Sequence, residues 1–159
     1  MPRKVTKALV RDIKPDRVYN SVMVQKTINR VMLDGKKQIA EKLVYDGMEK
    51  AAKKLKVDNP LDVFEQAFKN IQPHVETRSR RVGGANYQIP FEVKGQRQNH
   101  LTIMWFVAAA RSRKGMPMAD RIAAELMDAY NNQGTSVKKR EDVHKMAEAN
   151  RASAHFASF

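Results

Sequence analysis

The stretch from Val75 to Val93 constrains the fold of this chain most, because it alternates between polar and apolar residues with a two-residue period. The alternation is sharpest after Gly83-Gly84, where apolar side chains occupy every second position: Tyr87, Ile89, Phe91 and Val93. Two strand-like runs on either side of a glycine pair predict a β-hairpin. A loop over residues 83–85 would set Val75 opposite Val93 and keep the apolar side chains on one face. A two-residue loop would set Val75 opposite Glu92 and mix the faces, so we predict a loop of odd length.

The tip of this hairpin is strongly basic, since three arginines stand within four positions: Arg78, Arg80 and Arg81. Like charges this close repel one another unless an anion lies between them, and the planar guanidinium group suits phosphate. A solvated basic turn has the same composition, so the tip alone leaves both interpretations open.

Outside the hairpin, apolar residues recur at spacings of three and four in six segments, which predicts six helices. These helices follow the cap Asn20, run from Lys36 to Lys56, follow Asn59-Pro60, run from about Arg97 to Gly115, start at Pro117 and follow the cap Ser136. The predicted fold is mainly α, a single-domain bundle of six helices with a protruding β-hairpin inserted between helices three and four. In chain order the parts are a basic arm (1–17), helices one to three (18–72), the hairpin (74–93), helices four to six (97–150) and a tail (151–159) without periodicity.

Finer predictions concern single positions. Gly47, on the apolar face of the second helix, predicts the close approach of another helix, because glycine otherwise costs a helix about 1 kcal/mol. Glu125 is assigned to the outer face of the fifth helix. Two groups of cations lie in opening turns, where the helix dipole disfavours them: Lys36 and Lys37 in the second helix, and residues 138–140 (Lys-Lys-Arg) in the sixth. In the sixth helix, an anion held by the helix end and these side chains would reverse the sign of that effect.

The charge balance indicates a polyanionic partner. Thirty Lys and Arg against seventeen Asp and Glu leave a formal charge of +13 at pH 7, and such an excess attracts nucleic acid. Residues 1–17 contain few apolar side chains, so we expect this arm to become ordered on a partner. No stretch approaches the roughly 20 apolar residues of a membrane span, and no signal peptide is visible. The chain has no cysteine, which excludes disulfides and thiolate sites, and we expect a cytoplasmic location.

No motif points to catalysis, to a cofactor or to a metal. The histidines lack the i, i+4 partner of a zinc helix: His74, His100, His144 and His155. Glu141 and His144 form a single Glu-x-x-His, whereas a di-metal bundle needs two. Gly83-Gly84 lacks the further glycines of a phosphate-binding loop. Although a catalytic triad is a spatial arrangement that spacing does not reveal, we expect a protein that is not an enzyme.

Three long motifs, in this order, resemble bacterial ribosomal protein seven of the small subunit: VMLDGKKQIAE (31–41), PHVETRSRRVGGANYQIP (73–90) and VKKREDVHKMAEAN (137–150). The likeness covers the whole chain. It implies six helices with a protruding hairpin, and a primary binder of small-subunit rRNA that nucleates the 3′ major domain, the head. It also implies that the hairpin lies at the subunit interface near the exit-site tRNA and the mRNA. Small-subunit ribosomal proteins nine and eleven are the implied neighbours, and no homo-oligomer is expected.

Residue by residue, the resemblance assigns rRNA contacts to the basic positions of the family's motifs: Arg3, Lys4, Lys7, Lys36, Lys37, Arg78, Arg80, Arg81, Lys138, Lys139 and Arg140, with Arg111 and Arg113 as less diagnostic matches. It places one group of residues near tRNA and mRNA: Arg78, Arg80, Arg81, Val82, Gly83 and Gly84. The chain departs from the family at its end. Members often close with a Tyr-Arg-Trp-like sequence, whereas this chain ends in HFASF, so a terminal contact with RNA or tRNA stays open.

Two alternatives compete with a structural rRNA-binding protein. A DNA-binding regulator would place the fifth helix in a groove, but the outer face assigned to that helix is acidic: Asp120, Glu125 and Asp128 beside Arg121. An RNA-processing enzyme would need a catalytic site, which the sequence does not indicate. Folded RNA is recognised mainly through shape, phosphates and 2′-hydroxyls, which suits several cationic patches on one rigid body.

Overall fold

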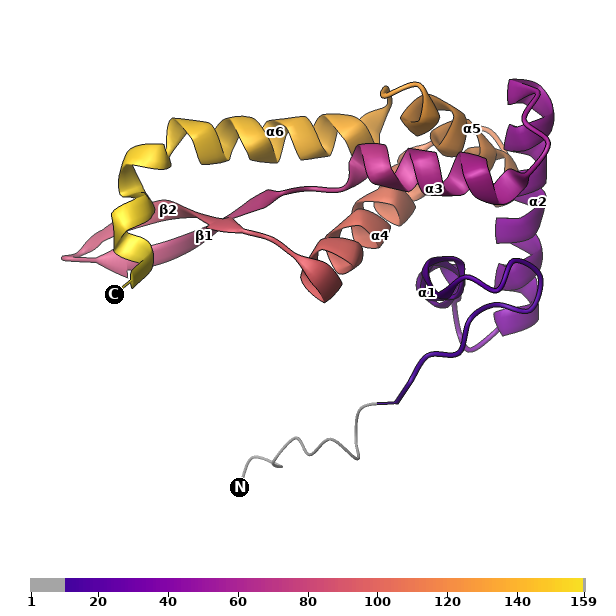
Figure 1. Cartoon of the computed structure of the whole chain (residues 1–159), viewed down its shortest axis with the longest axis horizontal. Coiled ribbons are helices and arrows are strands. Elements are labelled where there is room, and N and C mark those ends of the chain that lie inside the picture. Colours follow the sequence, from indigo (N-terminus) through magenta and orange to yellow (C-terminus); the bar gives the residue numbers. More distant parts are fainter. Residues whose placement is uncertain (1–10, 159) are drawn as a thin grey trace.

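The computed structural model describes residues 11–158, which form six α-helices, a β-hairpin and a closing 3-10 helix (Figure 1). The helices are α1 (Val22–Val31), α2 (Lys37–Leu55), α3 (Pro60–Ile71), α4 (Gly95–Ser112), α5 (Met118–Tyr130) and α6 (Thr135–Ala149), and the closing 3-10 helix is η2 (Arg151–Ser158). Strands β1 (Val75–Val82) and β2 (Ala85–Glu92) form an antiparallel pair between α3 and α4. The mainly α fold class with an inserted hairpin is thereby confirmed.

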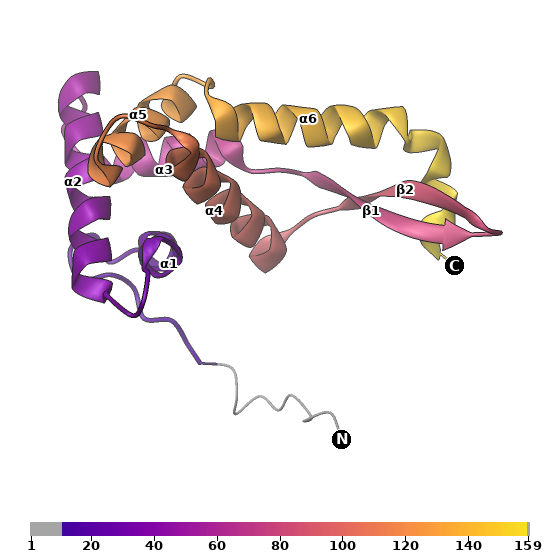
Figure 2. The same ribbon diagram turned by 180° about the vertical axis from the view of Figure 1, so that it is seen from behind.

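The hairpin protrudes from one end of the helical body, and α6 runs beside it (Figure 1, Figure 2). Contacts join α6 to both strands, and η2 packs on β2. Among the described residues the two strands form a sheet of their own, as an insertion between helices predicts. The long ribbon is therefore supported along its length by the end of the chain.

One apolar core joins all six helices. In α1 the predicted inner residues Val24, Ile28 and Val31 are buried, because spacings of three and four place them on one face. Helix α5 packs against α2, α3, α4 and α6, and α4 packs against α1, α3, α5 and α6, so these two helices are central to the bundle. Between α3 and α4 the rings of Phe68 and Phe106 lie 4.9 Å apart, centroid to centroid.

The crossing of α2 and α5 depends on Gly47, as predicted. A Cβ atom at this position would lie 2.6 Å from Ile122 Cγ2 and 3.1 Å from the Ala119 carbonyl oxygen. The first distance is far shorter than a van der Waals contact, so a side chain here would push the two helices apart.

The start of α3 agrees with the sequence prediction, whereas that of α1 does not. Asn59 Oδ1 accepts a hydrogen bond from the Leu61 N–H (3.1 Å), and Pro60 is the first residue of α3. The cap of α1 is Ser21 instead of Asn20. Ser21 Oγ accepts from the Val24 N–H (3.4 Å), while Asn20 has a left-handed φ of 51°, unlike the extended backbone of an N-cap.

The start of α6 also differs from the prediction. Gly134, with φ 92°, occupies the N-cap position instead of Ser136, and a Cβ there would lie 2.9 Å from Asp128 Cβ. Because α6 begins at Thr135, Lys138 closes its first turn, and Lys139 with the following arginine belongs to the second. The dipole penalty on these cations is therefore smaller than the sequence suggested, since it fades within one turn.

The predicted register of the hairpin is wrong by one residue. Val75 pairs with Glu92 and Val82 with Ala85, which leaves a two-residue loop. Its two glycines have φ values of 57° and 88°, the combination that a tight hairpin turn of this length requires. Glu76 consequently lies opposite Phe91 on one face. That face tolerates a carboxylate because arginines neutralise it, as described below.

The end of the chain is more regular than the sequence predicts. Residues after Asn150 form the 3-10 helix η2, and the Phe156 ring packs against Tyr87 of β2, with 4.8 Å between ring centroids. The lack of helical periodicity in the tail has a physical reason, because a 3-10 helix repeats every three residues and this one gains its apolar contact from the hairpin.

Candidate nucleic-acid interface

The arginines of the hairpin have unequal freedom. Arg78 Nε donates to Glu76 Oε1 (2.7 Å), and its guanidinium carbon lies 5.1 Å from the centre of the Phe91 ring. Arg80 Nη1 donates to the Phe156 carbonyl oxygen (3.3 Å). Arg81 is exposed at the tip, next to the turn. Of the three, Arg81 therefore has the head group most available to an external anion.

Glu76 organises the base of the hairpin. Its side chain is buried, and Oε2 accepts from Arg97 Nε (3.1 Å) and Nη2 (2.9 Å), while Oε1 accepts from Arg78. Burial alone would raise the pKa of Glu76, but the hydrogen bonds and charges of both arginines outweigh it and hold this pKa below its usual value. The carboxylate is therefore charged at neutral pH and ties β1 to the start of α4.

At the start of α6, one of the three predicted cations has an internal role. Arg140 Nη1 donates to the Asn70 carbonyl oxygen near the end of α3, and the side chain is only 20% exposed. Lys138 and Lys139 are exposed. The two lysines, and not the arginine, form the outward part of this patch.

Lys36 and Lys37 stand at the beginning of α2, as predicted. Lys36 is the N-cap residue and makes no capping hydrogen bond with its side chain, and the first turn contains no acidic residue. Both lysines are exposed. The first N–H groups of a helix lack partners within it and carry a partial positive charge. Two lysines at such an end increase its attraction for a phosphate.

Arg111 and Arg113 make contacts within the helical body. Arg111 Nη2 donates to the carbonyl oxygens of Arg30 (3.2 Å) and Val31 (3.4 Å) at the end of α1. Arg113 pairs with Glu125 through Nε (3.0 Å) and Nη2 (2.8 Å) and also contacts Asp128. Contact of either arginine with rRNA stays a prediction, but both side chains already hold helices together.

Glu125 does not lie on the outer face of α5, and this prediction is wrong. Its side chain is 0% exposed, and Oε1 accepts hydrogen bonds from the Ser136 N–H (3.0 Å) and Oγ (2.5 Å). The opposite oxygen binds Arg113. A carboxylate can be buried here because its partners converge on it from the C-cap of α4 and the first turn of α6. The remaining outward acids of α5, Asp120 and Asp128, are both partly exposed.

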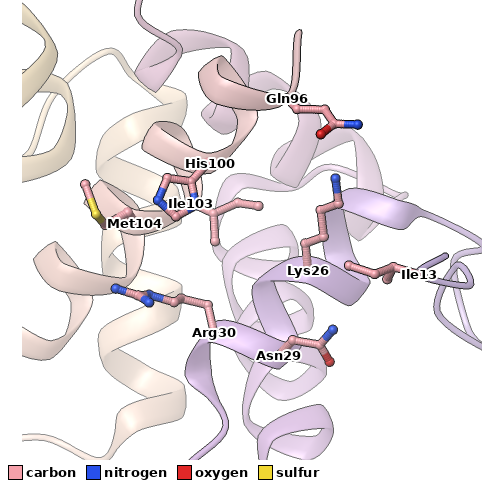
Figure 3. A pocket seen from close by; sticks show the side chains of 8 residues that line it. All are labelled: Ile13, Lys26, Asn29, Arg30, Gln96, His100, Ile103 and Met104. Atoms are coloured by element: carbon pink, nitrogen blue, oxygen red, sulfur yellow. The ribbon is translucent and has the colours of Figure 1, made fainter. Parts of the chain in front are cut away.

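A cleft between α1 and α4 contains basic and polar residues that the sequence analysis did not select (Figure 3). Its wall on α1 carries Lys26, Asn29 and Arg30, and its wall on α4 carries Gln96, His100, Ile103 and Met104, with Ile13 at one end. The spacing i, i+3, i+4 shows from sequence that the three α1 residues share a face. Their proximity to α4 follows only from tertiary packing, because residues 32–94 separate the two helices.

The remaining residues that the sequence analysis named are the cations of the arm and the histidines. Arg3, Lys4 and Lys7 of the arm lie outside the described residues. His74 and His144 meet at the base of the hairpin, where the His74 N–H donates to His144 Nε2 (3.2 Å). Among residues 11–158 no group of three or more His, Cys, Asp or Glu side chains is placed to hold a metal. Within the same residues, no helix combines the length and apolarity that crossing a membrane needs.

The comparisons with known proteins agree with one another. A family model described as ribosomal protein S7p/S5e matches residues 2–151. Small ribosomal subunit protein uS7 of Thermosipho africanus is 57% identical over 150 residues, which cover 94% of this chain and 96% of the relative. The proteins of the same name from Dictyoglomus turgidum and Chloroflexus aggregans are 58% and 56% identical over 146 residues, covering 92% of this chain and 93% and 92% of the relatives.

Proposed function

The chain belongs to the ribosomal protein S7p/S5e family, and from this premise we propose that it is a primary binder of small-subunit rRNA that nucleates assembly of the 3′ major domain, the head. Members of the family are structural proteins that bind rRNA within the small ribosomal subunit, which agrees with the expectations of an RNA-binding, non-enzymatic protein of the translation machinery. The ribosome in the cytoplasm is the corresponding location.

The observation that carries the proposal is the separation of the cationic patches on one packed body. Exposed lysines stand at the start of α2 and where the first turn of α6 ends, while an exposed arginine stands at the hairpin tip. In Figure 1, α2 and the hairpin tip lie at opposite ends of the molecule, and α6 begins between them. Patches so far apart suit several segments of one folded RNA, which is recognised through its phosphates and shape. Holding such segments together is what nucleation of a domain requires.

The protruding hairpin supports a second part of the proposal, namely that its tip lies near the exit-site tRNA and the mRNA. Arg81, Gly83 and Gly84 are exposed, and the turn that joins β1 to β2 lies at the end of the ribbon, away from the helical body (Figure 2). A tip of this kind reaches ligands that the body does not touch. Small-subunit ribosomal proteins nine and eleven are the proposed protein neighbours, a proposal that rests on the family alone.

The proposal is tested by binding to an rRNA fragment that contains the 3′ major domain. Duplex DNA of equal length should not displace the protein from this fragment, and footprinting should protect several separate RNA segments. Displacement by DNA at equal concentration would reduce the protein to a general polyanion binder, and a single protected segment would contradict nucleation.

The α6 patch is tested by the double variant Lys138→Ala/Lys139→Ala. If both lysines contact phosphates, the slope of log K against log salt should fall by about 2 units. The matched control is Lys53→Ala/Lys54→Ala, which removes two exposed lysines from the last turn of α2, where the helix dipole favours cations. Equal changes in both variants would show that only net charge matters.

The hairpin is tested by Arg80→Ala/Arg81→Ala, which leaves the ion pair of Arg78 with Glu76 in place. Binding to the head-domain fragment should weaken less than retention of tRNA in assembled subunits. Equal losses in the two assays would contradict a separate role for the tip.

A further inference from the structure

The cleft between α1 and α4 differs in charge from four other hollows of the described surface. Its eight lining residues include Lys26 and Arg30 and no carboxylate. Four other hollows each include at least one carboxylate in their lining. A concave site that is lined by cations and by no carboxylate attracts an anion.

The cleft also has an apolar floor. Ile103 is 5% exposed and belongs to the core, and Met104 is partly buried beside it. Figure 3 shows both on the α4 wall together with His100, facing the α1 wall that carries Lys26 and Arg30. The volume is about 400 Å³, within the range of about 300 to 1,000 Å³ that is typical of small-molecule sites.

Polar groups at the rim complete the arrangement. Asn29 Oδ1 accepts from Gln25 Nε2 (3.0 Å), which orients the Asn29 amide with its NH₂ group free of this bond. Gln96 supplies a second amide from α4, and His100 supplies a planar ring. Amides pair with the edges of nucleobases, and flat imidazole and guanidinium groups stack on their faces.

We propose that this cleft binds one unpaired nucleotide of an RNA, with the base against Ile103 and Met104 and the flanking phosphates at Lys26 and Arg30. This inference rests on the proposed function, since it takes RNA as the ligand of the protein. A base within an A-form duplex remains stacked and paired, so its faces do not reach such a floor. An extruded base presents both a face and an edge and leaves its phosphates at the rim.

The test follows methyl signals by NMR in the full-length protein, labelled at Ile and Met methyl groups. The probes are a short oligoadenylate, a G·C-rich RNA duplex of the same length, and adenosine monophosphate. Oligoadenylate should shift the signals of Ile13, Ile103 and Met104 in a saturable way, while those of Ile122 and Met48 in the core stay in place. The duplex, at equal phosphate concentration, should shift the cleft signals less.

Other outcomes of this titration overturn the inference in distinct ways. Equal shifts with the duplex would mean that the cleft only attracts phosphates. Tighter binding of adenosine monophosphate than of oligoadenylate would mean a site for free nucleotides. Unmoved cleft signals, in a protein that still binds the head-domain fragment, would remove the inference and leave the proposed function standing. Failure to bind that fragment would instead remove the proposed function.

A pair of variants isolates the cleft from net charge. Met104→Glu places a carboxylate on the floor, and Met116→Glu makes the same change at an exposed position outside the cleft. The first should weaken oligoadenylate binding by roughly tenfold or more, the loss expected for one stacked base, and the second should change it little. If Met104→Glu does not fold, Gln96→Glu at the exposed rim serves the same purpose. Equal weakening by the cleft and control variants would overturn the inference.

Discussion

Replacing Arg113 by Ala should lower the free energy of unfolding by about 3 kcal/mol, the lower end of the range for breaking a buried ion pair. Arg113 donates to Glu125 through two nitrogens, at 3.0 and 2.8 Å. Glu125 is 0% exposed, whereas the Arg113 side chain is 24% exposed, so water can partly replace the lost guanidinium. Burial alone would lower the pKa of Arg113, but its hydrogen bonds with Asp128 and Glu125 raise it, which agrees with a strongly held cation.

The cost of Arg113→Ala should come mainly from the carboxylate left buried without its cation. In the double variant Arg113→Ala/Glu125→Gln that charge is absent, so the loss should be smaller than the sum of the single losses by roughly 1 to 3 kcal/mol. The control is Arg111→Ala, which removes hydrogen bonds to two carbonyl groups and should cost about 1 kcal/mol. Urea unfolding followed by fluorescence of the buried Trp105 measures the unchanged protein, the two single variants of the pair, the double variant and the Arg111→Ala control.

Two results would refute this reasoning. One is equal stability of the Arg113→Ala and Arg111→Ala proteins. The other is an Arg113→Ala protein of unchanged stability whose RNA binding has a lower salt slope, which would mean that the guanidinium faces phosphate and not Glu125. We expect its salt slope to be that of the unchanged protein.

Gly47→Ala should lower the free energy of unfolding by about 1 to 3 kcal/mol despite the better helix propensity of Ala, because its Cβ would meet Ile122; a gain in stability by urea unfolding would contradict the close helix contact. Burial, together with the hydrogen bond to Asp16, raises the pKa of Tyr45 to about 12. Folding therefore favours the neutral phenol, and stability should fall as pH rises from about 10 towards that value. Ultraviolet absorbance should follow the titration of the Tyr45 phenol, and Asp16→Asn should lower the midpoint of this titration. A midpoint of about 10 in both proteins would contradict the hydrogen bond between Tyr45 and Asp16. Burial, a neighbouring arginine and a second histidine lower the pKa of His144, so its contribution to stability is present above about 6.5 and is lost as pH falls further. Between about pH 7.5 and 5, the melting temperature of the His144→Gln protein should fall less than that of the unchanged protein. Equal falls in the two proteins would contradict this.

The helical core could be predicted because each helix shows its inner face within its own sequence. In α1 the spacing of Val24, Ile28 and Val31 suffices, and all three are buried. The Asn59-Pro60 start of α3 was predictable for the same reason, since it depends on the backbone within one turn. The close approach at Gly47 was predictable because a glycine inside a helix is costly, although its partner, Ile122 of α5, was not. The hairpin register and the position of Glu125 were predicted wrongly, and each depends on residues that are far apart in the sequence.

The hairpin register is such a failure. Apolar alternation favoured Val75 opposite Val93, but Glu76 can lie on the buried face because Arg97, which follows 21 residues later, neutralises it. Nothing near Glu76 in the sequence identifies that partner. The same limit applies to Glu125, whose acidic character suggested solvent until α4 and α6 supplied its donors.

For the candidate site too, some features could be predicted from the sequence and others only from the tertiary structure. A basic composition and runs such as Lys138-Lys139 indicate a polyanionic partner without any structure. The structure separates the exposed lysines from Arg113 and Arg140, whose head groups bind protein groups. It also brings together the two walls of the cleft between α1 and α4, neither of which is recognisable as a binding site from its own sequence.

The sequence by itself therefore determined the helices, the inserted hairpin, the family and the sign of the partner's charge. Only the tertiary structure decided which cations are available to that partner and which hold the protein together. The physical reason is the range of each interaction. Helix formation and amphipathic periodicity act between residues three or four apart, whereas the burial and pairing of a charge depend on whatever packs against it in space, at any distance along the chain.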